Sequence, residues 1–155
     1  GDFKMAYKTI NPYTNEVEHE YPQATAAEVE KALTAAHRLY LRWRGGGELA
    51  ERKQVITRLG ELLRNRKHEL GTLITHDMGK LIGEAEGEVE LCASFCDYYV
   101  QRADQFLAPT PLYTESGNAY VLHQATGVLM AVEPWNFPFY RLPGSSFLIF
   151  WPETR

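Results

Sequence analysis

The residues of the sequence that could take part in chemistry lie between two prolines, in the stretch Pro134–Pro138. A proline disfavours helical conformations in the residue before it, so Glu133 and Phe137 are both expected to be extended. The segment that carries Trp135 and Asn136 is therefore expected to be stiff, and it follows an apolar, strand-like run. In α/β sheets, ligands bind at strand ends. A side-chain amide fixed there can donate a hydrogen bond to an oxygen that gains charge, which stabilises a transition state by roughly 3–4 kcal/mol.

Asn136 also has a simpler interpretation, in which the stretch is an apolar turn and the Asn side chain caps a following helix. The residue types alone favour this structural role, and both interpretations stay open at this point. The surroundings of the amide distinguish them, because a capping side chain accepts a bond from a backbone N–H of the helix that it caps.

The two cysteines, Cys92 and Cys96, are one helical turn apart in a long periodic segment. This spacing is awkward for a disulfide, and the pair is too sparse for a zinc site. Cys96 lies on an apolar stripe of this segment with three- and four-residue steps, so we expect it to be a core thiol. No basic residue lies one turn from either cysteine to lower a thiol pKa, so neither is expected to be a nucleophile. His76 and Asp77 are interpreted as a solvated helix terminus rather than as metal ligands, and no metal site is predicted.

Length and composition fit one ordinary domain. The chain has 155 residues, of which 45% are hydrophobic, and a formal net charge of −4. Charges of both signs are interspersed, so nothing indicates a nucleic acid or an anionic membrane as a partner. No apolar run approaches the ~20 residues that span a bilayer, and no signal-peptide pattern is seen, which favours a reduced, cytoplasmic protein. Residues 1–4 precede Met5 and are interpreted as an expression-vector remnant.

The hydrophobic spacing predicts a helix-rich chain with two β-hairpins. Thr25 and Glu28 match a capping box, which satisfies the first amides of a helix. The run Gly45–Gly47 predicts a loop that ends this helix rather than a phosphate cradle, because no strand precedes it. The other expected elements are a hairpin at 6–21, helices at 49–78 and 82–106, and a second hairpin with strands at 118–124 and 128–132.

Several charged residues lie near the ends of the expected helices. The basic run Arg64–Lys67 is interpreted as an exposed helix end. Gly79 is expected to cap a helix, and Lys80 follows it where a cation stabilises the negative helix end. Four alternating acidic residues are expected in a solvated first turn, namely Glu84, Glu86, Glu88 and Glu90.

Four stretches of the sequence together carry a family resemblance. They are NPYTNEV, THDMGKLIGEAEGEV, CASFCDYYVQRADQFL and GVLMAVEPWNFP. In this order they resemble the opening hairpin, a helix-to-helix junction, the third long helix and the signature loop of the NAD(P)-dependent aldehyde dehydrogenases. The resemblance covers Tyr7–Tyr140, and the HDMGK version resembles the succinate-semialdehyde branch. Residues 5–140 are therefore interpreted as the N-terminal portion of such an enzyme.

The resemblance implies an α/β fold of the aldehyde dehydrogenase type, of which this chain is the helix-rich N-terminal portion. In that family the Asn of PWNFP forms the oxyanion hole for a thiohemiacetal, a role that carries over to Asn136 as the catalytic residue. Pro134, Trp135 and Asn136 are implied to lie beside the cofactor, NAD or NADP, and the substrate is implied to be a small aldehyde. The family's nucleophilic Cys and general-base Glu segments have no counterpart in this sequence, so the chain alone is expected to be inactive.

Residues 141–155 resemble no segment of the family, because Pro143–Gly144 would break the long helix that relatives continue with. We interpret this tail as the product of a one-nucleotide deletion after the Tyr140 codon. Two other interpretations stay open: a non-catalytic assembly protein derived from the family, and a helical binding module in which PWNFP is a structural turn. The edges of the hairpin at 118–132 and the apolar tail predict a homo-oligomer or an aggregation-prone chain.

Overall fold

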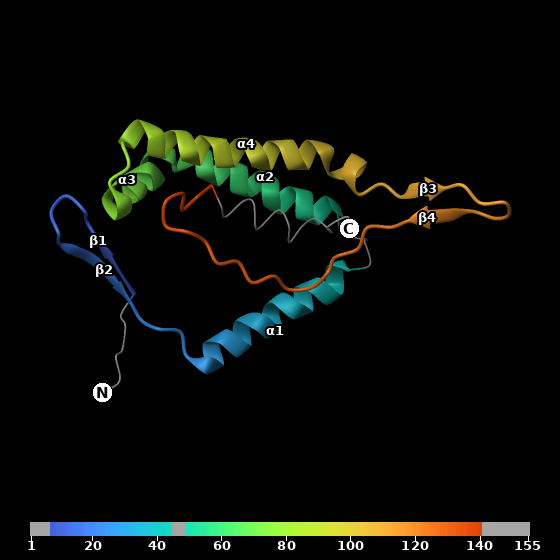
Figure 1. The fold of residues 1–155 in the computed structure, drawn as a ribbon, viewed down its shortest axis with the longest axis horizontal. Helices are drawn as coiled ribbons and strands as arrows, with labels where there is room; N and C mark the ends of the chain where they lie inside the picture. The colour runs from blue at the N-terminus through green and yellow to red at the C-terminus, as the bar shows by residue number, and fades with distance from the viewer. Residues whose placement is uncertain (1–6, 45–48, 141–155) are drawn as a thin grey trace.

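The computed structural model describes residues 7–44 and 49–140 of the chain. The predicted vector remnant at 1–4, the glycines at 45–47 and the predicted tail at 141–155 lie outside the described residues. Within those residues, the chain is helix-rich with two separate antiparallel strand pairs, as predicted (Figure 1). In order, the elements are β1 (Tyr7–Ile10), β2 (Val17–Tyr21), α1 (Ala26–Trp43), α2 (Leu49–Asn65), α3 (Lys67–Met78), α4 (Ile82–Phe106), β3 (Thr110–Leu112) and β4 (Ala119–Val121).

The core forms where α2 and α3 pack against α4, which lies alongside both (Figure 1). The apolar stripe of α4 steps by three and four residues, so it faces one side of the helix and is buried there. Gly60 of α2 allows a close approach, because a Cβ at this position would lie 3.1 Å from Cys96 Cβ. The buried cluster contains Ile56, Leu63, Leu70, Ile74, Ala85, Val89, Cys92, Ala93 and Cys96.

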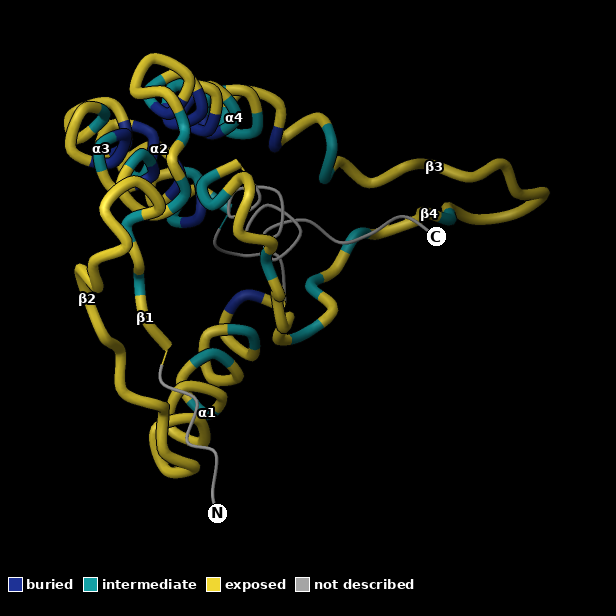
Figure 2. Tube along the Cα trace, turned by 60° about the vertical axis from the view of Figure 1, so that its left-hand side comes forward, coloured by how far each residue is buried: buried dark blue, intermediate teal, exposed yellow. Residues whose placement is uncertain are grey.

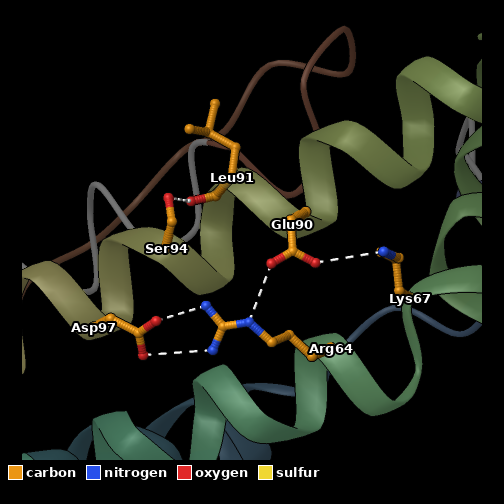
Figure 3. A network of polar contacts seen from close by, with 6 residues as sticks. All are labelled: Arg64, Lys67, Glu90, Leu91, Ser94 and Asp97. Carbon is orange, nitrogen blue, oxygen red and sulfur yellow. Dashed lines mark hydrogen bonds and ion pairs between the residues drawn. The ribbon is translucent and has the colours of Figure 1, made fainter.

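A network of ion pairs fastens α2 and α3 to α4 beside this core (Figure 3). The Arg64 guanidinium donates to both oxygens of Asp97, at 2.6 and 3.4 Å, and to Glu90 Oε1 at 3.1 Å. Lys67 Nζ lies 3.5 Å from the other Glu90 oxygen. Arg64 is exposed, as predicted for this basic run, and Lys67 is half-buried. What the prediction lacked is their pairing with carboxylates of a helix more than twenty residues away. The prediction of a single helix at 49–78 is wrong, because the backbone leaves helical geometry at Arg66 (φ −110°, ψ 15°) and separates α2 from α3.

Helix α1 begins as predicted but does not join this core. The Thr25 side chain accepts a bond from the Glu28 N–H at 3.2 Å, and the Glu28 carboxylate accepts one from the Thr25 N–H at 2.8 Å. Both views show α1 apart from α2, α3 and α4 (Figures 1 and 2). Val29 and Leu33 are 48% and 50% exposed, and Trp43 is the one buried residue of this helix. The apolar side chains of this helix are thus largely uncovered in the described part of the chain.

The first hairpin is confirmed, and its turn is built by polar side chains. Strands β1 and β2 pair antiparallel with an irregularity between Thr9 and Ile10. Asn11 Oδ1 accepts from the Tyr13 N–H at 3.0 Å, and its Nδ2 donates to Glu18 at 2.9 Å. The same Glu18 oxygen lies 2.9 Å from His76 Nδ1, so the hairpin is attached to the end of α3.

The second hairpin is present but was predicted in the wrong place. Strand β3 (Thr110–Leu112) pairs with β4 (Ala119–Val121), whereas residues 128–132 lie in no strand of the described chain. The segment around Pro111 was interpreted as a connector, yet a two-stranded ribbon leaves every second N–H unpaired, and a proline can occupy such a position. After β4 the chain instead returns toward the helices without regular structure (Figure 1).

Candidate functional site

The loop predicted to carry chemistry, Pro134–Tyr140, is a series of turns that lies against α4. Its C-terminal half is attached by aromatic contacts: the Tyr140 ring lies 5.6 Å from that of Phe95, and Phe139 packs on the buried cluster. Its N-terminal half is exposed, with 75% of Trp135 accessible to solvent. The C-terminal half therefore anchors the loop on α4, and the N-terminal half is exposed to solvent.

A buried ion pair, Lys80–Glu88, lies directly beneath this loop. Only 9% of the Lys80 side chain and 3% of the Glu88 side chain are exposed. Lys80 Nζ bonds to Glu88 Oε2, and it also donates to the backbone carbonyl of Asn136 at 3.2 Å. The same ammonium lies 4.0 Å from the ring centroid of Phe137, a cation–π contact.

The other oxygen of Glu88 binds the end of the loop. Glu88 Oε1 accepts from the backbone N–H of Phe139 at 2.9 Å and from that of Tyr140 at 3.0 Å. The pair thus contacts the loop at both ends of the Asn136–Tyr140 segment. The prediction that Glu88 lies in a solvated first turn is wrong, because Glu88 is buried and binds a segment more than fifty residues away. Lys80, which was expected only as a cation at a helix end, donates to the same segment.

Local sequence explains how both side chains reach this position. Gly79 adopts φ 76°, a left-handed conformation that suits glycine, and its N–H donates to the Thr75 carbonyl at 2.9 Å. This cap turns the chain out of α3 and leads it through Lys80 into α4. Glu88 lies beside the buried residues Ala85, Val89 and Cys92 on α4. A glutamate on an apolar helical stripe is the signal that could have revealed a partnered, buried carboxylate.

Asn136 is held through its backbone and exposed through its side chain. Its carbonyl accepts the Lys80 bond, whereas no bond of its side-chain amide is seen within the described residues. The amide is therefore available as a donor to a bound molecule. The alternative role as a helix cap concerns residues beyond 140, which lie outside the described residues, so the role of Asn136 stays a prediction.

His76 and Asp77, the remaining candidates from the sequence, lie at the end of α3 near the first hairpin. His76 pairs with Glu18, and Asp77 borders a cavity of about 660 Å³ between the first hairpin, α3 and the back of the loop. Asn136 does not line this cavity. No cluster of three or more His, Cys, Asp or Glu side chains suited to a metal is found among the described residues. None of the helices in these residues is long and apolar enough to cross a membrane.

Both cysteines are core thiols, as was predicted for Cys96. Cys92 and Cys96 are fully buried in the contact between α2 and α4. Burial raises the pKa of Cys92 to about 12, with a further contribution from the Glu88 charge. Burial likewise raises the pKa of Cys96 to about 11, with Asp97 contributing. Because a thiolate is the reactive form, neither thiol is suited to act as a nucleophile near neutral pH.

We expect both thiols to resist alkylation while the chain is folded. At about pH 8 iodoacetamide should modify them roughly 100-fold or more slowly than in the same chain unfolded in urea, because folding suppresses the thiolate. The raised pKa of Cys92 stabilises the fold fully below its ordinary value of 9.0, and this contribution is lost as the pH rises toward about 12. Mass spectrometry of the labelled chain measures the rates. Equal rates in the folded and unfolded states would contradict the assignment of Cys92 and Cys96 to the core.

The chain is similar to known proteins over most of its length. A family model described as the aldehyde dehydrogenase family matches residues 2–146. The crystal structure of succinic semialdehyde dehydrogenase from Streptococcus pyogenes in complex with NADP+ matches at 49% identity and a TM-score of 0.85, covering 89% of this chain and 30% of that chain.

Curated relatives agree with this structural match. Succinate-semialdehyde dehydrogenase (NADP+) of Deinococcus radiodurans is 40% identical over 136 residues, which are 88% of this chain and 28% of the relative. Succinate semialdehyde dehydrogenase (NAD(P)+) Sad of Escherichia coli is 33% identical over 134 residues, or 86% of this chain and 29% of the relative. The chain thus spans less than a third of the length of the proteins that it matches.

Proposed function

Because the chain belongs to the aldehyde dehydrogenase family, we propose that it supplies the oxyanion donor for oxidation of an aldehyde to a carboxylic acid. The donor is the side-chain amide of Asn136. The relatives named above support succinate semialdehyde as the aldehyde and NADP, with NAD as the alternative, as the cofactor. The complete reaction is a property proposed for a protein of the relatives' length, to which this chain corresponds in its N-terminal portion.

The chemistry assigned to Asn136 follows from the charge that the reaction creates. Attack of a thiolate on the aldehyde carbon moves an electron pair of the carbonyl bond onto oxygen. The Asn136 amide donates to this oxygen and stabilises the charge as it forms. The thiolate comes from another segment of the family enzyme, because Cys92 and Cys96 are buried and protonated. A nicotinamide cofactor bound beside Pro134 and Trp135 would supply the acceptor for the hydride of the same carbon.

One observation carries this proposal. The backbone carbonyl of Asn136 is fixed by Lys80, while the side-chain amide of the same residue is exposed. A donor whose backbone is held needs little reorganisation when charge develops, which is the property that makes such donors effective. An amide that merely completed a turn would be expected to bond to a neighbouring backbone group instead.

Pro134 and Trp135 fit the nicotinamide side of a cofactor site. Both are exposed next to Asn136, and 75% of Trp135 is accessible, so an apolar face is available for a flat ring. A glycine-rich turn between a strand and a helix, which would bind the pyrophosphate, is not seen among the described elements. We therefore assign to this chain the nicotinamide end of the site, with phosphate binding by other segments of the family protein.

A chimera tests the proposed function. Residues 7–140 of this chain would replace the matching segment of the Streptococcus pyogenes enzyme, and NADPH formation from succinate semialdehyde would be followed by absorbance. We expect turnover by the chimera, because its Pro134–Tyr140 loop presents the same donor. A chimera that folds and binds NADP+ but forms no NADPH would contradict the proposal.

A non-catalytic assembly protein is the second candidate, and two exposed surfaces favour it. The hairpin of β3 and β4 projects away from the helices (Figure 1), and Leu112 and Tyr120 on it are 52% and 54% exposed. The apolar face of α1 is also open, as Figure 2 shows by the predominance of exposed residues on this helix. Either surface suits a second copy of the chain, so we include a homo-oligomer in the proposal. The cytoplasmic location predicted from the sequence also stays part of the proposal.

We expect the isolated chain to self-associate. Unpaired amides and carbonyls at the edges of β3 and β4 can pair with other chains, and the open face of α1 favours association through apolar contact. Replacing Leu33 with Glu on α1 should weaken the association, whereas Glu30→Gln on the same helix should leave it nearly unchanged. Sedimentation velocity is the measurement. A stable monomer at tens of micromolar, a range in which exposed edges commonly aggregate, would contradict the expectation.

A further inference from the structure

The chemistry proposed for Asn136 does not use the two buried charges beneath its loop. We propose that Lys80 and Glu88 are positioning residues that hold the Pro134–Tyr140 loop in the conformation that presents the Asn136 amide. The catalytic consequence rests on the function proposed above, whereas the holding of the loop can be tested without any activity.

Glu88 holds the C-terminal half of the loop through two consecutive amides. The N–H groups of Phe139 and Tyr140 both point at Glu88 Oε1, at 2.9 and 3.0 Å. Successive backbone N–H groups that converge on one anion form a favourable anion-binding arrangement. Hydrogen bonds to an ionised acceptor are about twice as strong as neutral ones. The carboxylate therefore fixes the direction in which the chain leaves the loop.

Lys80 holds the residue that carries the donor. Its ammonium bonds to Glu88 Oε2 and to the Asn136 carbonyl, and it contacts the face of the Phe137 ring. A fixed carbonyl restricts the backbone rotation of Asn136, and this rotation sets the direction of its side chain. Lys80 thus couples the anchored half of the loop to its exposed half.

The chemical nature of the pair supports a positioning role over a purely stabilising one. Desolvation of two charges offsets most of their attraction, so a buried ion pair is often no more stabilising than apolar residues of similar volume. The Lys80–Glu88 pair is buried next to the apolar cluster, where apolar side chains could have packed. Apolar residues could not form the three hydrogen bonds that Lys80 and Glu88 make with the loop backbone.

Hydrogen exchange of the isolated chain tests the proposal. The change is Glu88→Gln, which keeps the shape of the side chain and removes its charge. We expect the exchange rates of the Phe139 and Tyr140 amides to rise roughly 10- to 100-fold, as loss of a charge-assisted bond implies. The amides of Val89 and Ala93 in α4 should not change. Exchange detected by mass spectrometry with fragmentation to single residues, at a chain concentration below that of self-association, makes the comparison.

The matched control is Glu90→Gln, on the same helix. Glu90 also forms two ion pairs, with Arg64 and Lys67, but it does not contact the loop. Its replacement should leave the Phe139 and Tyr140 amides protected. Equal increases in both variants, or an increase spread over all of α4, would overturn the proposal, because the pair would then serve the stability of the helices alone.

Two substitutions of Lys80 supply an independent readout. Lys80→Arg keeps the charge and several donors, so the loop amides should remain largely protected. Lys80→Met keeps an apolar stem and loses the charge, so these amides should exchange about as fast as in Glu88→Gln. Loss of protection in both Lys80 variants to the same extent, or in neither, would contradict a role for the Lys80 charge.

The outcomes separate this inference from the proposed function. If the loop amides lose protection in Glu88→Gln and the chimera is inactive, the role of Asn136 is refuted and the positioning of the loop by Glu88 stands. If the chimera is active and the Phe139 and Tyr140 amides are unprotected already in the unchanged chain, the positioning by Glu88 is refuted and the role of Asn136 stands.

Discussion

In the chimera described above, Asn136→Ala is expected to lower the rate of acylation by ~10²–10³-fold, the usual effect of deleting one oxyanion donor. The reason is that the amide bonds to charge that exists only after the thiolate attacks. Affinity for the aldehyde should change much less, because the neutral carbonyl of the substrate is a weaker acceptor. Single-turnover formation of NADPH measures the rate, and its dependence on aldehyde concentration measures the affinity.

Asn118→Ala is the matched control for this experiment. Asn118 is an exposed Asn in the loop before β4, far along the chain from the Pro134–Tyr140 loop. We expect its replacement to leave the acylation rate unchanged. An unchanged rate in Asn136→Ala as well would return Asn136 to a capping or turn role.

In the isolated chain, Glu88→Ala should lower the free energy of unfolding by about 3–5 kcal/mol, the usual cost of removing one partner from a buried ion pair. The cost arises because the Lys80 ammonium would be left buried without its carboxylate, and the Phe139 and Tyr140 amides would lose their acceptor. Urea unfolding followed by helical circular dichroism measures the change.

Glu90→Ala controls for the general loss of a glutamate from α4. Glu90 is half exposed and its ion pairs are screened by water, so its replacement should have a much smaller effect. Glu88→Ala with a loss no larger than that of Glu90→Ala would mean that the Lys80–Glu88 pair is solvated in solution.

Elements whose pattern is local could be predicted from the sequence. Helix α4 has the predicted bounds, Ile82–Phe106, because apolar residues recur at helical spacing through most of its length. The capping box at Thr25 and the cap at Gly79 were predicted for the same reason, since each depends on neighbouring residues. The burial of Cys96 followed from its place on that stripe.

Features that depend on distant residues were missed. The partner of strand β4 is β3 rather than the segment at 128–132, and short strands carry too little pattern to specify pairing. Glu88 was placed in a solvated first turn, and Lys80 was expected only to stabilise the end of a helix. Their true partners, in the Pro134–Tyr140 loop, are set by the packing of this loop on α4, which no local spacing encodes.

The central claim is that the Lys80–Glu88 pair and Asn136 act as one unit, and a double-mutant cycle in the chimera tests it most directly. The rate of acylation would be measured for Glu88→Gln, for Asn136→Ala and for the two together. If the pair acts by positioning the Asn136 amide, Glu88→Gln should slow acylation when Asn136 is present and have little further effect in the Asn136→Ala background. Fully additive effects of the two substitutions would contradict the claim.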